Sequence, residues 1–487
     1  MSFKVKIILL FSLAIFTRFF CLGWGQGNFF HPDENNMATS LSQLSSQNLN
    51  PHFFAYGQFP LYLGFFTLKI FGIANTFINS IFILRFYSAV FSLLSLYFFY
   101  KIYPRLSFVL LLIFTPGLIQ LSHFGTTESL LILTFVINLY LTKLILKKPS
   151  SKLFLFAALN TGIAIATKIS GAIFIFPIFL AAVISQSWLI IPYAFLTSIF
   201  SILFSPYNFL AWSDFLSSMR YETAVATGSI SVFYTTQFSH SLPYIFQITK
   251  IFPYVNGWSI LLFALLSIPL LKFIKDKRYY LIIFISCFIY FLYFGQLYVK
   301  WTRFMSPLFF VLPLLSAYFI STLKSRFYRL ISIVLACLPG IFFMINYFLP
   351  DTRLAASQYL LSQLPANSTI LSESSNVVNL PVLPNNFNVI NYDFYNNYSN
   401  YLSSYLLSTN YIIIPSRRVF KNYSLNYYQH LFDGTLGFQE IKKFPPFTDF
   451  FLNPENAEET WSVFDRPTIR IYKKVKNLTL DQYENLL

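Results

Sequence analysis

Eleven long apolar runs constrain this chain more than any other feature of its sequence. Most are close to the length that a helix needs to cross a hydrocarbon core of roughly 30 Å. They are residues 5–22, 78–99, 106–122, 128–146, 153–167, 170–186, 188–205, 257–272, 279–298, 304–323 and 328–348. Only 11% of the residues are charged, against roughly 25% in soluble proteins. We therefore predict an α-helical polytopic membrane protein with about 11 transmembrane helices.

The first run resembles a signal peptide, but it lacks a small-residue cleavage site and many further runs follow it, so we expect an uncleaved first helix. Of the 23 cations in residues 1–349, 15 fall in the loops of one side. The positive-inside rule makes that side the cytoplasm. The prediction is a multi-pass protein of the cell (plasma) membrane.

We place the long loops 23–77 and 206–256 and the short turn SHFGTTES on the other side of the membrane. After Pro350 the chain becomes rich in Asn, Ser and Tyr. A helix near RLAASQYLLSQL and strands near TILSES, YIIIPS and TIRIYKK predict a small α/β domain. We therefore divide the chain into a membrane domain, 1–349, and an extracytoplasmic α/β domain, 350–487.

The net charge of +16 does not indicate a nucleic-acid partner, because its cations lie mostly between apolar runs. Cys21, Cys287 and Cys337 all lie in or beside apolar segments. They support neither a disulfide framework nor a thiolate metal site.

Two adjacent carboxylates, Asp33 and Glu34, begin the first outer loop in the stretch FFHPDENN. Residues 1–349 contain only six acidic side chains, and carboxylates are costly to place near a bilayer, so a functional role is the first hypothesis. The alternative is a solvated loop in which the Asp caps the following helix.

Carboxylates beside cations suit sugar transfer from a lipid-linked phosphate. A general base takes the proton of the acceptor hydroxyl, and cations stabilise the departing phosphate. The cations Lys168 and Arg303 are placed against the positive-inside bias, and phosphate contact explains them slightly better than pairing with carboxylates. The carboxylates also suit the binding of a divalent cation. Metal dependence stays open, because His31 and Glu128 can either bind an ion or not.

Several stretches carry a resemblance to a known family. HPDENN, SHFGTTESLLI, GIAIATKISG, SPYNFL with YETAVATG and YTTQF, and KWTRFMSPLFFVLP match its motifs in order along the chain. LPANSTILSES, YYQHLFDGTLGF and EETWSVFDRPTIRIYKK match its bacterial tail. The chain resembles the GT-C superfamily of membrane glycosyltransferases, in the bacterial branch of protein O-mannosyltransferases and lipid A aminoarabinose transferases.

The resemblance implies roles for individual residues. Asp33 falls at the position of the catalytic base, and Glu34 at a second acidic position that orients acceptor or donor. Lys168, Arg303 and, more weakly, Lys300 fall where family cations approach the lipid phosphate. The remaining substrate-site candidates are Glu128, where the family often has Asp, and His123, Arg220, Glu222, Tyr234 and Gln237. Packing is the alternative for His123, Tyr234 and Gln237, and mutual pairing the alternative for Arg220 and Glu222.

The resulting prediction is a membrane glycosyltransferase with an outward-facing site. It moves a sugar from a polyprenyl-phosphate donor to a protein, glycan or lipid acceptor outside the cytoplasm. A transporter or flippase of lipid-linked sugars is a second hypothesis, although no internal repeat of the kind common in transporters is visible. A non-catalytic envelope assembly factor is a third.

Overall fold

The computed structural model describes residues 3–373, 386–392, 401–415 and 425–487. Its contacts divide the chain into two compact units. The first contains Met1–Leu22, Asp33–Ile230 and Leu242–Met344, and the second contains Gly23–Pro32, Ser231–Ser241 and Ile345–Leu487. The second unit therefore includes two short segments from the loops between the apolar runs.

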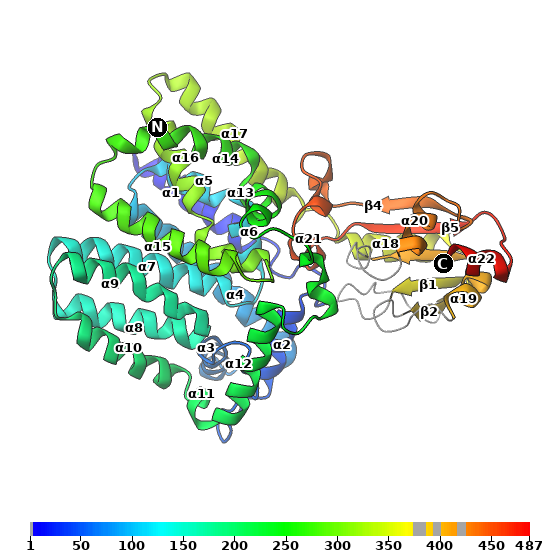
Figure 1. Cartoon of the computed structure of the whole chain (residues 1–487), viewed down its shortest axis with the longest axis horizontal. Coiled ribbons are helices and arrows are strands. Elements are labelled where there is room, and N and C mark those ends of the chain that lie inside the picture. Colours follow the sequence, from blue (N-terminus) through cyan, green and yellow to red (C-terminus); the bar gives the residue numbers. More distant parts are fainter. Residues whose placement is uncertain (1–2, 374–385, 393–400, 416–424) are drawn as a thin grey trace. The chain divides into compact units, whose positions relative to one another are not determined.

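The first unit consists of helices (Figure 1). They are α1 (Phe3–Phe19), α2 (Pro32–Ser42), α3 (Phe59–Ile70), α4 (Phe77–Ile102), α5 (Leu106–Ile113), α6 (Pro116–His123), α7 (Glu128–Lys147), α8 (Ser151–Thr167), α9 (Ile175–Ile184), α10 (Ile190–Phe204), α11 (Tyr207–Leu210), α12 (Trp212–Thr227), α13 (Phe252–Asn256), α14 (Trp258–Ser267), α15 (Lys277–Gly295), α16 (Val311–Thr322) and α17 (Arg326–Ile345). Shorter 3-10 or π segments are η1 (Ile169–Phe174), η3 (Gln247–Ile251), η4 (Ile268–Phe273) and η5 (Thr302–Leu308).

Four of these helices, α4, α7, α15 and α17, are long and apolar enough to cross a membrane. Three bent pairs raise the number of candidate spans to seven among the described residues, and α3, α8, η1 with α9, and α10 are shorter apolar helices. The chain is therefore a multi-pass membrane protein. The eleven crossings expected from the apolar runs stay a prediction, because several of those runs do not form one straight helix.

The bends have local causes. The predicted run 106–122 divides into α5 and α6, which meet at 58°, because Pro116 opens α6 and holds Thr115 in an extended conformation. Gly257 separates α13 from α14 with a φ of +89°, and the two parts of that pair meet at 108°. Only glycine adopts this backbone conformation without strain.

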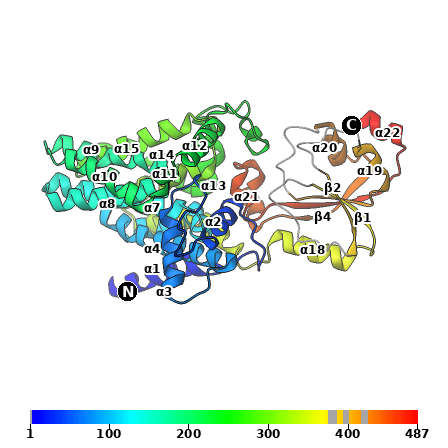
Figure 2. The same cartoon turned by 90° about the horizontal axis from the view of Figure 1, so that it is seen from below.

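Helices α7 and α8 pack side by side, and α10 packs against α8, as Figures 1 and 2 show. Buried polar groups link the three helices. The Asn138 side-chain amide donates to Thr161 Oγ1 over 2.8 Å, and Thr161 lies 3.0 Å from the Tyr193 hydroxyl. Such bonds between helices hold apolar segments in one register in a membrane.

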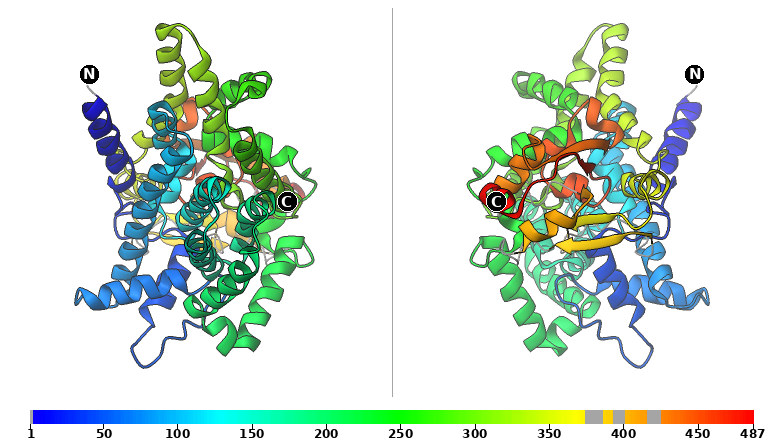
Figure 3. Two further views of the ribbon diagram at one scale, coloured as in Figure 1. Left: turned by 90° about the vertical axis from the view of Figure 1, so that its left-hand side faces the viewer. Right: turned by 90° about the vertical axis from the view of Figure 1, so that its right-hand side faces the viewer.

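The second unit is built on a five-stranded mixed sheet in the order β2-β1-β3-β5-β4. Its elements are η2 (Phe233–Phe238), α18 (Thr352–Gln363), β1 (Thr369–Glu373), β2 (Asn388–Tyr392), α19 (Leu402–Ser408), β3 (Tyr411–Ile414), α20 (Leu425–Phe432), β4 (Phe438–Phe444), η7 (Phe447–Phe450), η8 (Pro454–Asn456), α21 (Thr460–Val463), β5 (Ile469–Lys474) and α22 (Leu480–Leu486). Strands β2, β1 and β3 are parallel, and β5 is antiparallel to both of its neighbours. The strands can be followed in the right-hand view of Figure 3.

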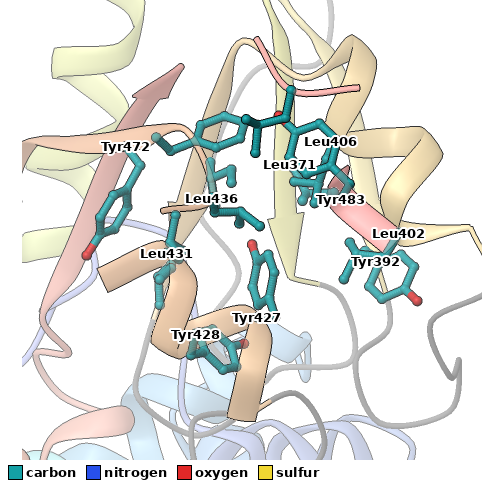
Figure 4. Packing of buried hydrophobic residues seen from close by; sticks show 14 residues of the cluster. Leu371, Tyr392, Leu402, Leu406, Tyr427, Tyr428, Leu431, Leu436, Tyr472 and Tyr483 are labelled. Atoms are coloured by element: carbon teal, nitrogen blue, oxygen red, sulfur yellow. The ribbon is translucent and has the colours of Figure 1, made fainter. Parts of the chain in front are cut away.

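Alternate residues of this sheet supply two cores, as the side-chain period of a strand requires. Ile370 and Ile413 pack toward α18, whereas Leu371 and Ile412 pack toward α19, α20 and α22. Figure 4 shows the second core, where Tyr427 lies among leucines of several elements. The predicted small α/β domain is confirmed, with a mixed five-stranded sheet that packs against helices. Its strands β2 and β4 were not predicted.

Candidate active site

Asp33 lies in the first turn of α2 and forms an ion pair with Arg303 of η5. The two side chains are partly exposed, at 21% for Asp33 and 20% for Arg303. The Arg303 guanidinium also lies over the Trp301 ring, 4.6 Å from its centroid. The position at a helix N-terminus favours a negative charge on Asp33. The Asp33 carboxylate therefore has a cationic partner and remains partly exposed.

Glu34, the next residue, is fully buried. Its carboxylate accepts hydrogen bonds of 2.7 Å from Arg85 Nε, Arg85 Nη2 and the backbone N–H of Gly125. A Cβ on Gly125 would lie 2.9 Å from Glu34 Oε1, so this glycine allows the close approach. The contacts tie the start of α2 to α4 and to the turn before α7.

Lys168 lies at the junction of α8 and η1, and Glu128 begins α7. Lys168 Nζ is 3.8 Å from Glu128 Oε1. The same ammonium lies over two aromatic rings, 4.9 Å from the centroid of Tyr56 and 5.3 Å from that of Phe304. The start of α7, the loop that contains Tyr56 and element η5 therefore each place a side chain against Lys168.

Element η5 connects the two ion pairs, because Arg303 and Phe304 are adjacent on it. Glu222 on α12 belongs to the same group. Burial raises the pKa of the Glu222 carboxyl, and the positive charge of Lys168 opposes that rise. We call Asp33, Glu128, Lys168, Glu222 and Arg303 the charged cluster.

Two other predicted residues of the first unit, His123 and Lys300, lie outside the charged cluster. His123 is fully buried on α6, with Nδ1 2.8 Å from the Ile119 carbonyl and Nε2 2.9 Å from the Phe20 carbonyl. Lys300 is buried and donates to the Tyr298 carbonyl over 2.9 Å. His123 thus occupies the packed position that was the alternative to catalysis.

Arg220 and Glu222 were considered as partners of each other. Arg220 is exposed on α12, and no Arg220–Glu222 ion pair occurs among the described side chains. Glu222 instead lies within the electrostatic range of Lys168. The charged cluster therefore includes Glu222 without Arg220.

Tyr234 and Gln237 belong to the second unit. The Gln237 side chain donates to Glu458 Oε1 over 2.8 Å and accepts from the backbone N–H of Glu459 over 3.0 Å. Tyr234 packs edge-on against Phe233 at 5.1 Å. The contacts of Gln237 anchor η2 within this unit.

Tyr56 and Phe304 were missed by the sequence analysis. Both are single aromatic residues in a chain that is 21% aromatic, so their type carries little signal. Their positions offer some signal, because Phe304 directly follows Arg303 and Tyr56 precedes a glycine in the aromatic stretch HFFAYGQF of the first outer loop.

The described residues contain no group of three or more His, Cys, Asp or Glu side chains placed to hold a metal ion. His31 belongs to the second unit and stacks on Phe464 with 4.5 Å between ring centroids. Glu128 belongs to the first unit, where it pairs with Lys168. The role of a divalent cation stays open.

The sequence matches one known family. Residues 61–212 match the model of the dolichyl-phosphate-mannose-protein mannosyltransferases. Residues 61–212 belong to this family. The match confirms the predicted family and the predicted enzyme class, a glycosyltransferase. The matched segment includes Glu128 and Lys168 and ends before Arg303, while Asp33 precedes it.

No curated protein matches the sequence. Among solved structures, ArnT from Cupriavidus metallidurans in the apo state is 17% identical, with a TM-score of 0.47 over 74% of this chain and 71% of that chain. The same protein bound to undecaprenyl phosphate gives 17% identity and a TM-score of 0.47 over 74% and 73%. The Archaeoglobus fulgidus oligosaccharyltransferase tethered to an acceptor peptide is 12% identical, with a TM-score of 0.45 over 84% and 68%.

Proposed function

We propose that this glycosyltransferase moves one sugar from a polyprenyl-phosphate donor to an acceptor hydroxyl outside the cytoplasm, with Asp33 as the general base. The observation that carries the proposal is the charged cluster, in which a partly exposed carboxylate and two cations meet in a membrane-spanning helical unit. The acceptor is a protein, a glycan or a lipid that offers such a hydroxyl.

In this reaction the acceptor oxygen attacks the anomeric carbon of the donor sugar. A bond forms between these two atoms while the bond from the anomeric carbon to the phosphate oxygen breaks. Asp33 takes the proton of the acceptor hydroxyl. The bonding electrons leave on the polyprenyl phosphate, whose charge Lys168 and Arg303 stabilise.

The different burial of the two adjacent carboxylates supports Asp33 as the base. Asp33 is 21% exposed, whereas Glu34 is fully buried against Arg85. A base must come within hydrogen-bond reach of the acceptor hydroxyl. Glu34 therefore acts as a positioning residue that holds the first turn of α2, in place of the orienting contact with acceptor or donor that the family resemblance implies.

The ion pairs of the charged cluster support Lys168 and Arg303 as phosphate ligands. Each cation is paired with one carboxylate, Lys168 with Glu128 and Arg303 with Asp33. A phosphate oxygen can take the place of a carboxylate oxygen, because both anions accept charge-assisted hydrogen bonds from Lys and Arg. When the donor binds, its phosphate therefore replaces a carboxylate as the partner of Lys168 and of Arg303.

The outward orientation is supported by charge placement. Of the 23 cations in residues 1–349, 15 lie in the loops assigned to the cytoplasm. Asp33, Glu128 and Glu222 lie in the segments assigned to the opposite side. In this topology the α/β sheet of residues 350–487 is also extracytoplasmic.

The test measures binding of undecaprenyl phosphate to purified protein in lipid nanodiscs. Lys168→Ala and Arg303→Ala should each weaken binding, by about tenfold if each charge-assisted contact contributes about 1.4 kcal/mol. Lys69→Ala is the matched control, because Lys69 lies in the last turn of α3, donates to Ser46 Oγ and is not a member of the charged cluster. Unchanged affinity in both cluster variants would contradict phosphate contact.

Release of lipid phosphate separates the proposal from its rivals. Glycosyl transfer frees polyprenyl phosphate from a polyprenyl-phosphate sugar only when an acceptor is present. A flippase moves the same lipid without cleaving it, and an assembly factor does neither.

A further inference from the structure

The backbone around Tyr56 is anchored to the residues that precede Lys168. The N–H of Gly57 donates to the Thr167 carbonyl over 2.9 Å. A Cβ on Gly57 would lie 2.0 Å from the Ala166 carbonyl oxygen, so only glycine permits this approach. Tyr56 and Lys168 are therefore each one residue from the same backbone contact.

A second anchor holds the other side of this segment. The N–H of Gln58 donates to Ser205 Oγ over 3.1 Å, and its side-chain amide donates to Asn208 Oδ1 over 3.1 Å. Gln58 Oε1 in turn accepts from the N–H of Tyr207 over 2.9 Å. Residues 57 and 58 are thus fixed on both sides, and they hold the adjacent Tyr56 next to Lys168.

The rings of Tyr56 and Phe304 form an aromatic cradle for the Lys168 ammonium, at 4.9 and 5.3 Å from their centroids. Only 8% of Tyr56 is exposed. A cation over an aromatic face is attracted by the ring quadrupole, and the attraction grows when water is excluded. The cradle therefore holds the ammonium at one place.

The Tyr56 phenol remains neutral in this environment. Burial, and then the carboxylates of Glu128 and Glu222, raise its pKa well above the usual value. A neutral ring attracts the ammonium without adding an anion. An anionic side chain at this position would instead repel an incoming phosphate.

We propose that Tyr56 is a positioning residue, whose ring holds the charged Lys168 ammonium in the orientation that receives the donor phosphate. The inference rests on the proposed function for its substrate, and on the geometry around Lys168 for its mechanism. Phe304 is the second ring of the aromatic cradle and has the same role. Neither aromatic residue takes part in proton transfer.

The binding test compares Tyr56→Leu with Tyr56→Phe. The leucine removes the aromatic ring, and the phenylalanine keeps the ring while removing the hydroxyl. Binding of undecaprenyl phosphate in nanodiscs should weaken about tenfold in Tyr56→Leu and change less than about twofold in Tyr56→Phe. Equal loss in both variants would overturn the inference, because the hydroxyl would then carry the effect.

A second measurement does not depend on the donor. The rate at which an amine-reactive reagent acylates Lys168, followed by mass spectrometry without lipid donor, should rise several-fold in Tyr56→Leu and stay near the wild-type rate in Tyr56→Phe. Phe304→Leu should also raise it, so the test does not depend on one variant. Equal labelling rates in wild type, Tyr56→Leu and Phe304→Leu would overturn the cradle.

Lipid binding and lysine labelling together distinguish a failure of the proposed phosphate contact from a failure of the positioning role of Tyr56. If labelling responds as expected but Lys168→Ala leaves lipid binding unchanged, the proposed phosphate contact fails and the positioning role fails with it. If Lys168→Ala weakens lipid binding while Tyr56→Leu leaves it unchanged, the proposed function stands and the inference about Tyr56 is wrong.

Discussion

At the scale of single residues, two neighbouring carboxylates meet opposite environments. Asp33 is partly exposed beside Arg303, whereas Glu34 is fully buried between Arg85 and the N–H of Gly125. Removing one partner of a buried ion pair leaves an uncompensated charge in a low-dielectric site. Removing one partner of a partly exposed pair costs much less.

This contrast predicts different losses of stability from two matched substitutions. Glu34→Gln should lower the free energy of unfolding by about 3–5 kcal/mol because Arg85 loses its counter-ion. Asp33→Asn, one residue away, should lower it by less than about 1 kcal/mol. Thermal unfolding of both purified variants in one detergent measures the difference, and equal losses would contradict the assignment of Glu34 to the buried pair.

The same geometry makes donor phosphate and Asp33 competitors for Arg303. Asp33→Asn should therefore bind undecaprenyl phosphate about two- to fivefold more tightly than wild type, the range expected for removing a partly exposed pair. Binding in nanodiscs measures this gain. Weaker binding in Asp33→Asn would show that Asp33 supports the donor site instead of competing for its cation.

The sequence predicted part of this site and missed part of it. The family resemblance gave Asp33 and Glu34 different roles, and the structure gives them different burial. The Glu34 partners Arg85 and Gly125 lie far along the chain, as does the Asp33 partner Arg303, and only folding brings them together. Tyr56 was missed because one aromatic residue among many in an aromatic-rich chain has no distinguishing pattern.

At the scale of elements, hydropathy predicted the straight helices and failed at the bends. The runs 78–99, 128–146, 279–298 and 328–348 agree with α4, α7, α15 and α17 within a few residues. The run 304–323 instead divides into η5 and α16, which meet at 42°. Hydropathy averages over a window and cannot register such breaks, yet the break at η5 places Arg303 beside Asp33.

Close packing of α17 gives a prediction at this scale. A Cβ on Gly340 would lie 1.8 Å from the Phe114 carbonyl oxygen, and backbone atoms at the end of α5 cannot move aside easily. Gly340→Ala should therefore lower the free energy of unfolding by about 1–3 kcal/mol.

The neighbouring Ile341 is 38% exposed on the same helix, so Ile341→Ala serves as the control and should cost less. Both variants are compared by thermal unfolding in detergent. A Gly340→Ala protein as stable as wild type would show that α17 does not approach α5 this closely.

At the scale of the whole molecule, the sequence predicted a multi-pass membrane protein with a small α/β domain, and both statements hold. The division at residue 349 and the side of the membrane on which the charged cluster lies remain predictions. Strands β2 and β4 were missed because β2 lies in a stretch rich in Asn and β4 has an exposed, charged face.

Sidedness predicts which loops react with a membrane-impermeant maleimide. In a variant without Cys21, Cys287 and Cys337, Gln47→Cys should be labelled in intact cells, because residues 23–77 are assigned to the outside. Pro149→Cys, in the cation-rich loop between α7 and α8, should react only after permeabilisation. Both positions are exposed. The reverse pattern would place the charged cluster in the cytoplasm.

The most direct test of the central claim is the rate of lipid phosphate release by Asp33→Asn. The purified variant is supplied with a polyprenyl-phosphate sugar and an acceptor under conditions in which wild type is active. Loss of the general base should lower the rate by about 10²- to 10⁴-fold, while donor binding, measured in parallel, is retained or tighter. A wild-type rate in Asp33→Asn would contradict the role of Asp33 as the base.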